Sequence, residues 1–277
     1  MRGLTAFALC AALVAMAFAT ARTEPVPTEA IVVIAHRGDK ESAPENTLPA
    51  IEAAIEIGAD YVEIDVRTTA DGELVVIHNS TVDQRTDGNG RVREMTFAEI
   101  RSLDAGSWYD SSFAGTKIPT AEEAMLCAKG RINVFLEVKA ASPEDIVALL
   151  DSTDMFESTI VYDGTAALKE MRALDPRVRA MVPRPPADLS QLPALMEELA
   201  PTHFCHSTKI KPPATTPEVT AEIVEACHNV GAKVYVNVMH NDTPEGWEYA
   251  LSTGADGLET DRAAACIAFL EERGLRD

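Results

Sequence analysis

Eight short apolar segments, each expected to form a β-strand, recur along the chain, and most are separated by stretches with helical patterning. Alternating strands and helices favour an α/β fold with a parallel sheet, because consecutive parallel strands need a helical crossover. Eight such units predict a closed (β/α)8 barrel of the TIM type, which 277 residues can form as one domain. The strands are expected at Ile31–Ala35, Tyr61–Val66, Ile132–Val138, Thr159–Tyr162, Val178–Val182, Thr202–Cys205, Lys233–Val238 and Asp256–Glu259.

Helix-capping residues support this alternation. Thr47 precedes a helix expected from about Leu48, and Gly58 follows its end. A capping residue three positions before Glu, or directly before Pro, is typical of a helix start. Such starts occur at Thr120 with Glu123, Ser142-Pro143, Thr216-Pro217 and Thr243-Pro244.

One segment departs from the alternation after the second expected barrel strand. Asp71-Gly72 stands between two apolar runs, which is a strong signal for a β-hairpin. A two-residue turn there would pair Asp65 with His78, and directly opposite residues share a face of the sheet. The hairpin therefore predicts His78 beside Asp65, on an added antiparallel strand.

Residues 79–118 are expected to form an inserted cap segment near the mouth of the barrel. This stretch is irregular in pattern, apart from a short helix opened by the capping box of Thr96 and Glu99. The barrel domain itself is expected to span residues 31–277, with this cap as its small insertion.

The N-terminal residues predict export. Met1-Arg2 gives a positive start, Leu4–Ala19 carries no charge, and small residues follow. This pattern is typical of a signal peptide over residues 1–21, with residues 22–30 as a linker. The alternative is a membrane anchor, but the apolar run is shorter than the ~20 residues of a spanning helix. The expected location is periplasmic or secreted, with no stable membrane span after cleavage.

The net charge and the cysteine content indicate which binding partners, disulfides and metal sites to expect. The net charge of −20 repels phosphate backbones, so nucleic acid is not expected as a partner. Of the five cysteines, Cys10 lies in the expected signal peptide, and the four that remain are an even number, which permits disulfides in an exported protein; their wide spacing disfavours a zinc site. We interpret these four residues as small buried hydrophobic side chains: Cys127, Cys205, Cys227 and Cys266.

Charged residues interrupt the expected strands at one end of the barrel, where active sites of this fold lie. Glu63, Asp65 and Glu137 would bring three carboxylates together, which favours a hard divalent ion, Mg²⁺ or Ca²⁺. Arg37 and Lys139 follow the same strand ends, and they provide positive charge for a phosphate group.

Two histidines complete this candidate site. His36 and His78 can serve as a general base and a general acid near neutral pH. Taken singly, each of these residue types is more often structural than catalytic; their common position at one end of the strands favours phosphoryl-transfer chemistry.

Several motifs in this order resemble the glycerophosphodiester phosphodiesterase family. The resemblance covers most of the chain after the N-terminal segment and is weakest from about Ser158 to Thr216. It departs from the family pattern at Asn79, where Asp is usual, and at Arg262-Ala263, where Pro often follows Asp261. The matching motifs are His36-Arg37-Gly38, Pro44-Glu45-Asn46-Thr47, Gly58-Ala59-Asp60, Glu63-Ile64-Asp65-Val66, Thr69-Ala70-Asp71-Gly72, Val76-Ile77-His78, Arg85-Thr86, Phe135-Leu136-Glu137-Val138-Lys139, Gly254-Ala255-Asp256-Gly257 and Thr260-Asp261.

The resemblance implies a barrel enzyme that cleaves glycerophosphodiesters, a small-molecule substrate, to glycerol 3-phosphate and an alcohol. It implies acid–base catalysis by His36 and His78, with the glycerol 2-hydroxyl attacking phosphorus before water opens the cyclic phosphate. It also assigns the metal to the three carboxylates and the phosphate to Arg37 and Lys139. Two alternatives remain open: a related phospholipid phosphodiesterase that releases the cyclic phosphate, and an inactive phosphodiester-binding barrel.

Overall fold

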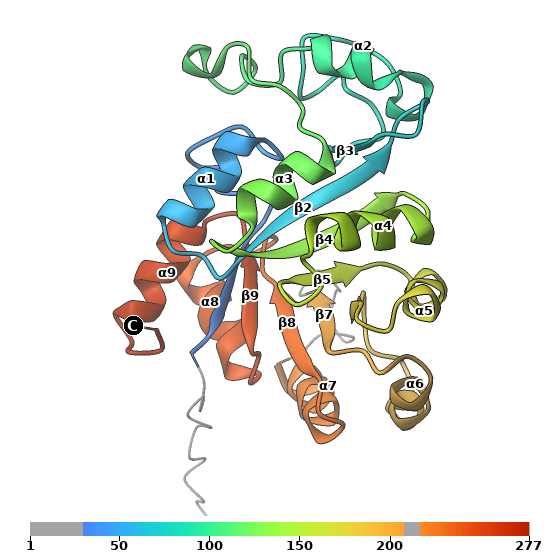
Figure 1. Ribbon diagram of the computed structural model, residues 1–277. Coiled ribbons are helices and arrows are strands. Elements are labelled where there is room, and N and C mark those ends of the chain that lie inside the picture. Colours follow the sequence, from blue (N-terminus) through green and yellow to red (C-terminus); the bar gives the residue numbers. More distant parts are fainter. Residues whose placement is uncertain (1–29, 208–216, 277) are drawn as a thin grey trace, which may run out of the picture.

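The computed structural model describes residues 30–207 and 217–276, and these residues form a closed barrel of parallel strands with helices outside (Figure 1). The ring closes because β1 pairs with both β2 and β9. The prediction of a (β/α)8 barrel is confirmed, and every expected strand is present with its ends shifted by no more than two residues. The barrel strands are β1 Val32–Ala35, β2 Tyr61–Thr68, β4 Asn133–Ala140, β5 Thr159–Tyr162, β6 Arg179–Val182, β7 His203–Ser207, β8 Lys233–Asn237 and β9 Gly257–Thr260.

The helices that follow the strands begin mostly where the capping residues predicted. Thr120 and Glu123 form a complete capping box, and Ser142 and Thr243 accept hydrogen bonds from the first turns of their helices. Thr47 occupies its cap position, but its hydroxyl donates to the Pro44 carbonyl instead. Thr216 lies outside the described residues. The helices are α1 Leu48–Glu56, α2 Phe97–Ser102, α3 Ala121–Ala128, α4 Pro143–Thr153, α5 Thr165–Leu174, α6 Leu192–Leu199, α7 Pro217–Asn229, α8 Pro244–Ser252 and α9 Ala263–Glu271. Among the described residues, no helix has both the length and the apolar character to cross a bilayer.

Two apolar layers stabilise the barrel. Residues such as Val134 and Leu136 point outward and pack in the large core beneath the helices. The residues between them in sequence, such as Phe135, point inward, because side chains alternate across a strand. The inner layer that fills the barrel comprises Ile34, Tyr61, Phe135, Ile160, Met181, Cys205 and Tyr235. Inward-facing residues two positions further along the same strands therefore lie directly above an apolar floor.

The hairpin is present, but its predicted register is wrong. Strand β3, Leu74–Val76, pairs antiparallel with β2, and Val66 lies opposite Val76. The loop contains one residue more than a two-residue turn, and Gly72 closes it with a φ of +90°. That left-handed conformation is typical of a three-residue hairpin loop. Ile77 rather than His78 consequently reaches Asp65, with its backbone nitrogen 2.9 Å from the Asp65 carbonyl oxygen.

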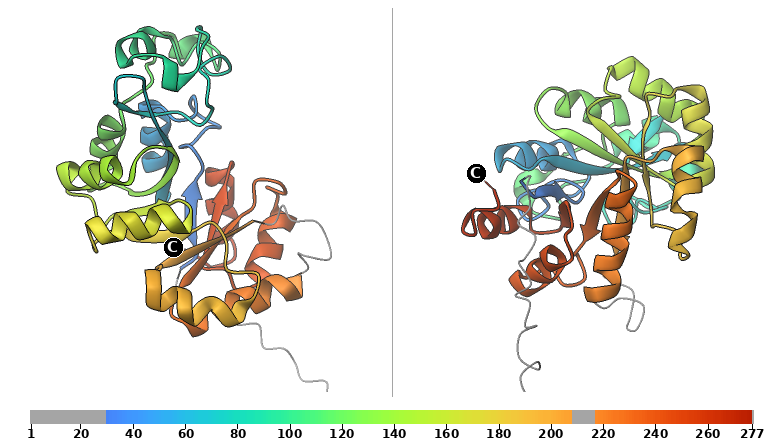
Figure 2. Two further views of the ribbon diagram at one scale, coloured as in Figure 1. Left: turned by 90° about the vertical axis from the view of Figure 1, so that its right-hand side faces the viewer. Right: turned by 90° about the horizontal axis from the view of Figure 1, so that it is seen from below.

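The segment between β3 and α3 forms a small subdomain with its own core. It contains α2, opened by the complete capping box of Thr96 and Glu99, and lies beyond the carboxyl end of β2 (Figures 1 and 2). Its buried core comprises Val75, Ile77, Val82, Val92, Ile100, Ala105 and Ile118. The Tyr109 hydroxyl donates to the Glu41 carbonyl at 2.6 Å, which ties this cap to the loop after β1.

The four cysteines of the described barrel are all free thiols. Cys205, Cys227 and Cys266 are buried, while the half-buried Cys127 donates to Glu52 at 3.3 Å. Burial raises the pKa of Cys227 and Cys266 to about 12, so both remain neutral thiols near neutral pH.

Candidate active site

Three carboxylates meet above the apolar floor, as the strand positions predicted. Glu63 and Asp65 lie two residues apart on β2, and Asp65 is directly opposite Glu137 of the neighbouring strand β4. One oxygen from each of the three lies within 4.8 Å of the others. Glu63 and Asp65 are fully buried, whereas Glu137 is partly exposed toward the mouth.

Two oxygens of this cluster lack hydrogen bonds. Glu63 Oε1 and Asp65 Oδ1 are buried and accept none in the described part of the chain. Burial raises the pKa of Glu63 well above its usual value, and the neighbouring charges of Asp65, Glu137 and Glu259 raise it further. Gathering several carboxylates in this way is unfavourable unless a cation neutralises them, so the cluster is suited to holding a divalent ion.

His36 follows β1 and is held by an acidic partner. Its Nδ1 lies 2.6 Å from Asp261 Oδ1, and Lys40 Nζ lies 3.3 Å from the same nitrogen. Burial lowers the pKa of His36 to about 4, so the ring is neutral near neutral pH. A carboxylate can only accept, so Nδ1 carries the ring proton and Nε2 is left with its lone pair. That Nε2 points toward Glu63, at 3.9 Å from Oε2.

Strained backbone brings hydrogen-bond donors to the two buried carboxylates. Arg37 and Asn46 adopt left-handed φ values of +61° and +59°, which are uncommon for residues other than glycine. The Arg37 backbone N–H donates to Glu63 at 2.7 Å, and the Asn46 amide donates to Asp65 at 2.7 Å. Gly38 also has a positive φ, and a Cβ there would lie 2.6 Å from Ala50, so the loop needs glycine at this position. Such strain is characteristic of functional sites.

The two predicted phosphate-binding cations lie at the same cluster. Arg37 contacts Glu45 at 2.9 Å and Asp65 at 3.3 Å. Lys139 pairs with Glu137 and lies 3.3 Å from Asp65. Both side chains therefore reach the carboxylates, and both are partly exposed, at 14% and 19%. Their positive charges therefore lie between the carboxylate cluster and the open mouth of the barrel.

His78 lies beside this cluster rather than within it. Its side chain lines a small cavity with Glu45, Asn46 and Arg85, on the side of the cap. Its carbonyl accepts two hydrogen bonds from the Arg67 guanidinium, and its Nδ1 lies 2.8 Å from Asn79 Oδ1. In the described part of the chain, no hydrogen bond or ion pair joins the His78 side chain to the three carboxylates.

Several residues of the site have no predicted role from sequence. Asp261 holds His36, Asn46 bridges the loop to Asp65, and Glu45 links Arg37 to Arg85. All three belong to motifs that carried the family resemblance, and that resemblance was the sign in the sequence that could have identified them. Their roles depend on contacts between distant strands and loops, which spacing along the chain does not indicate.

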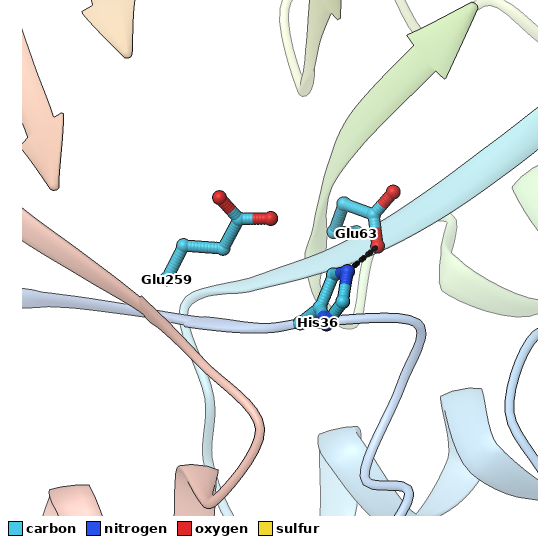
Figure 3. A group of neighbouring side chains, drawn as sticks. All are labelled: His36, Glu63 and Glu259. Atoms are coloured by element: carbon cyan, nitrogen blue, oxygen red, sulfur yellow. Dashed lines mark ion pairs between the residues drawn. The ribbon is translucent and has the colours of Figure 1, made fainter. Parts of the chain in front are cut away.

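Glu259 also joins the site. It lies on β9 and is 3% exposed, and its carboxylate points toward His36 and Glu63 (Figure 3). One donor atom from each of the three lies within 4.8 Å of the others. Burial raises the pKa of Glu259 to about 8, with further contributions from the charges of Glu137 and Asp65.

The model of the glycerophosphoryl diester phosphodiesterase family matches residues 36–265 of this chain, which include every residue of the site. The chain therefore belongs to this family and is a phosphoric diester hydrolase. It is 32% identical to a glycerophosphodiester phosphodiesterase of Caldanaerobacter subterraneus subsp. tengcongensis over 254 residues, 88% of this chain and 99% of that relative.

Solved structures share the fold. The crystal structure of a glycerophosphodiester phosphodiesterase from Agrobacterium tumefaciens superposes with a TM-score of 0.71 at 29% identity. The match covers 85% of this chain and 99% of that one. A phosphodiesterase of Oleispira antarctica, solved with its product sn-glycerol-3-phosphate, has a TM-score of 0.74 at 24% identity over 87% of this chain and 97% of its own. At that identity the second likeness supports the fold alone.

Proposed function

We propose that this enzyme hydrolyses glycerophosphodiesters to glycerol 3-phosphate and an alcohol, and that it depends on a divalent cation. The observation that carries the proposal is the meeting of Glu63, Asp65 and Glu137 within 4.8 Å, beside two basic side chains at the barrel mouth. The family and its relatives supply the class of substrate; the cluster supplies the argument for the ion.

The donor set fits Mg²⁺ or Ca²⁺. Both ions prefer oxygen ligands, and the cluster offers only carboxylate oxygens. Glu63 Oε1 is buried and has neither a hydrogen bond nor an ion pair in the described part of the chain, so an ion would satisfy an atom that the described protein groups leave unbonded. When bound, such an ion stabilises negative charge that develops on the phosphoryl oxygens.

The protein groups around the ion provide the remaining functions. Arg37 and Lys139 bind the phosphate and hold it against the cluster. His36 Nε2 takes the proton of the glycerol 2-hydroxyl as that oxygen attacks phosphorus, while Asp261 keeps the ring in the required tautomer. His78 protonates the departing alcohol. In the second stage the histidines exchange roles, and water opens the cyclic phosphate.

A product assay tests this proposal. The enzyme is supplied with glycerophosphocholine, -ethanolamine, -glycerol or -inositol and with Mg²⁺ or Ca²⁺, and phosphorus-31 NMR follows the products. We expect the free monoester to accumulate, and we expect excess chelator to abolish turnover. A persistent cyclic phosphate would instead favour the phospholipid-type phosphodiesterase, and full turnover in chelator would exclude metal dependence. No turnover of any substrate with either ion would favour an inactive binding barrel.

We also propose that the protein is exported and loses residues 1–21. The apolar run and the small residues after it support this proposal. N-terminal sequencing of protein purified from its native host tests it, and a mature chain that begins at Met1 would refute it.

A further inference from the structure

Glu259 is a buried carboxylate that has no basic partner among residues 30–207 and 217–276. Its Oε2 accepts a hydrogen bond from the Asn237 amide at 3.0 Å. Arg37 and Lys139 pair with Asp65, Glu45 and Glu137, and no ion pair within residues 30–207 and 217–276 involves Glu259. Burying a charged carboxylate is costly unless a positive group neutralises it. The ion at the other three carboxylates does not explain why a fourth one is present.

A second potential metal ligand, the lone-pair nitrogen Nε2 of His36, lies close to the Glu259 carboxylate. In the described part of the chain His36 Nε2 forms no hydrogen bond, and Glu63 Oε2 lies 3.9 Å from it. The His36 side chain is 7% exposed and its Nδ1 is already engaged by Asp261. Figure 3 shows Nε2 directed at Glu63, with the Glu259 carboxylate approaching from β9. Two carboxylates and one unpaired imidazole nitrogen thus converge from three neighbouring strands or their ends.

We infer that His36, Glu63 and Glu259 form a second cation site, which selects Zn²⁺ or Mn²⁺ over Mg²⁺ and Ca²⁺. An imidazole nitrogen suits the transition metals, whereas the all-oxygen cluster beside it suits the hard ions. Zinc holds nitrogen and oxygen ligands at about 2.0–2.2 Å, so modest side-chain rotations bring donors within 4.8 Å onto one ion. An organic ammonium would need more space than three side chains with at most 6% exposure leave.

Glu63 belongs to both groups of donors, and its two oxygens allow it to bridge two ions. Two-metal centres of hydrolases commonly hold their ions about 3.5–4 Å apart. In this enzyme the second ion would occupy the His36 nitrogen that the proposed reaction uses as its base. Occupancy of the second site therefore inhibits turnover. This effect on turnover rests on the proposed function, whereas binding of the ion does not.

Calorimetric titration of Zn²⁺ into the Mg²⁺-saturated enzyme tests the site, with bound Mg²⁺ and Zn²⁺ counted by mass spectrometry. We expect one Zn²⁺ per chain in addition to retained Mg²⁺, and a fall in turnover of at least about tenfold at saturation, as expected for loss of a general base. Glu259→Gln should weaken the Zn²⁺ affinity at least about tenfold, as removal of a charged ligand does. Glu248→Gln is the matched control, because this exposed residue on α8 pairs with Arg273 far from the site.

Three outcomes would overturn the second site: no additional ion in the unmodified enzyme, replacement of Mg²⁺ by Zn²⁺ one for one, or equal Zn²⁺ affinity in Glu259→Gln and Glu248→Gln. A visible absorption band of bound Co²⁺, lost in Glu259→Gln, would support it independently of activity. If the enzyme binds the second ion but turns over no glycerophosphodiester, the proposed function fails and the second site stands.

Discussion

The two halves of the barrel differ sharply in what their strands carry. Strands β9, β1, β2 and β4 are consecutive in the sheet, and their carboxyl ends bear the acidic and basic residues of the site. Strands β5, β6, β7 and β8 complete the ring, and none of their residues is a carboxylate. Their inward-facing side chains, such as Ile160, Met181 and Cys205, belong to the apolar floor.

The difference shows how one fold combines a cluster of like charges, which destabilises it, with apolar burial, which stabilises it. Neighbouring strands lie about 4.8 Å apart, so charges that must share an ion have to lie on adjacent strands. The resulting repulsion and the left-handed φ values of Arg37 and Asn46 destabilise that half. The apolar half supplies burial without such a cost. We therefore expect substitutions in the first half to affect turnover and those in the second half to affect stability.

The largest effect on turnover is expected from Glu63→Gln. The change removes a charged ligand at the centre of the cluster, so kcat/KM should fall by at least about 10²–10³-fold and Mg²⁺ binding should weaken in calorimetry. It also relieves repulsion, because burial and neighbouring carboxylates raise the pKa of Glu63. The melting temperature in chelator should therefore rise. Glu248→Gln should change none of these quantities. A lower melting temperature for Glu63→Gln would contradict the inference that repulsion between carboxylates destabilises the charged half of the barrel.

Lys139→Met should lower kcat/KM by about 10²-fold, because it removes a cation that adjoins the carboxylates on the charged side of the mouth. Arg184, exposed after β6, provides the comparison on the other side. In steady-state assays the kcat/KM of Arg184→Met should remain within about threefold of that of the unmodified enzyme, as is usual for surface substitutions. Equal losses in the two variants would place the phosphate across the whole mouth instead of on the β4 side.

Asp261→Asn should lower kcat about tenfold to a hundredfold and leave KM nearly unchanged, because Asp261 acts through His36. Burial lowers the pKa of His36 to about 4, while the hydrogen bond and charge of Asp261 raise it. Losing that charge lowers the pKa further, so the acidic limb of the profile of kcat/KM against pH should move to lower pH. A shift toward higher pH would show that Asp261 does not control His36.

The smallest effect on turnover is expected from Phe204→Ala on β7. Phe204 is fully buried in the core beneath the helices, so the free energy of unfolding should fall by about 3–5 kcal/mol in denaturant titrations. Turnover by the folded fraction should stay within about threefold, because the residue faces away from the site. A large loss of kcat in fully folded protein would show that the apolar half also positions the catalytic groups.

The sequence predicts the barrel well because buried parallel strands are continuous apolar runs with capped helices between them. It predicts Glu63, Asp65 and Glu137 for the same reason, since carboxylates that interrupt such runs are conspicuous. The hairpin register is wrong by one residue because Gly72 allows a longer loop than the Asp-Gly signal suggests. Contacts such as Asp261 with His36 depend on closure of the ring, and no local pattern of residues specifies them.

The seam of the barrel lies within the site, because β1 closes the ring against β9. The carboxylates of β2 and β4 precede Glu259 and Asp261 in the chain, so they leave the ribosome first. His36 receives the acidic partner that fixes its tautomer only after these later residues have been added. Catalysis by His36 therefore depends on closure of the ring between β1 and β9, the pair of strands farthest apart in the barrel sequence.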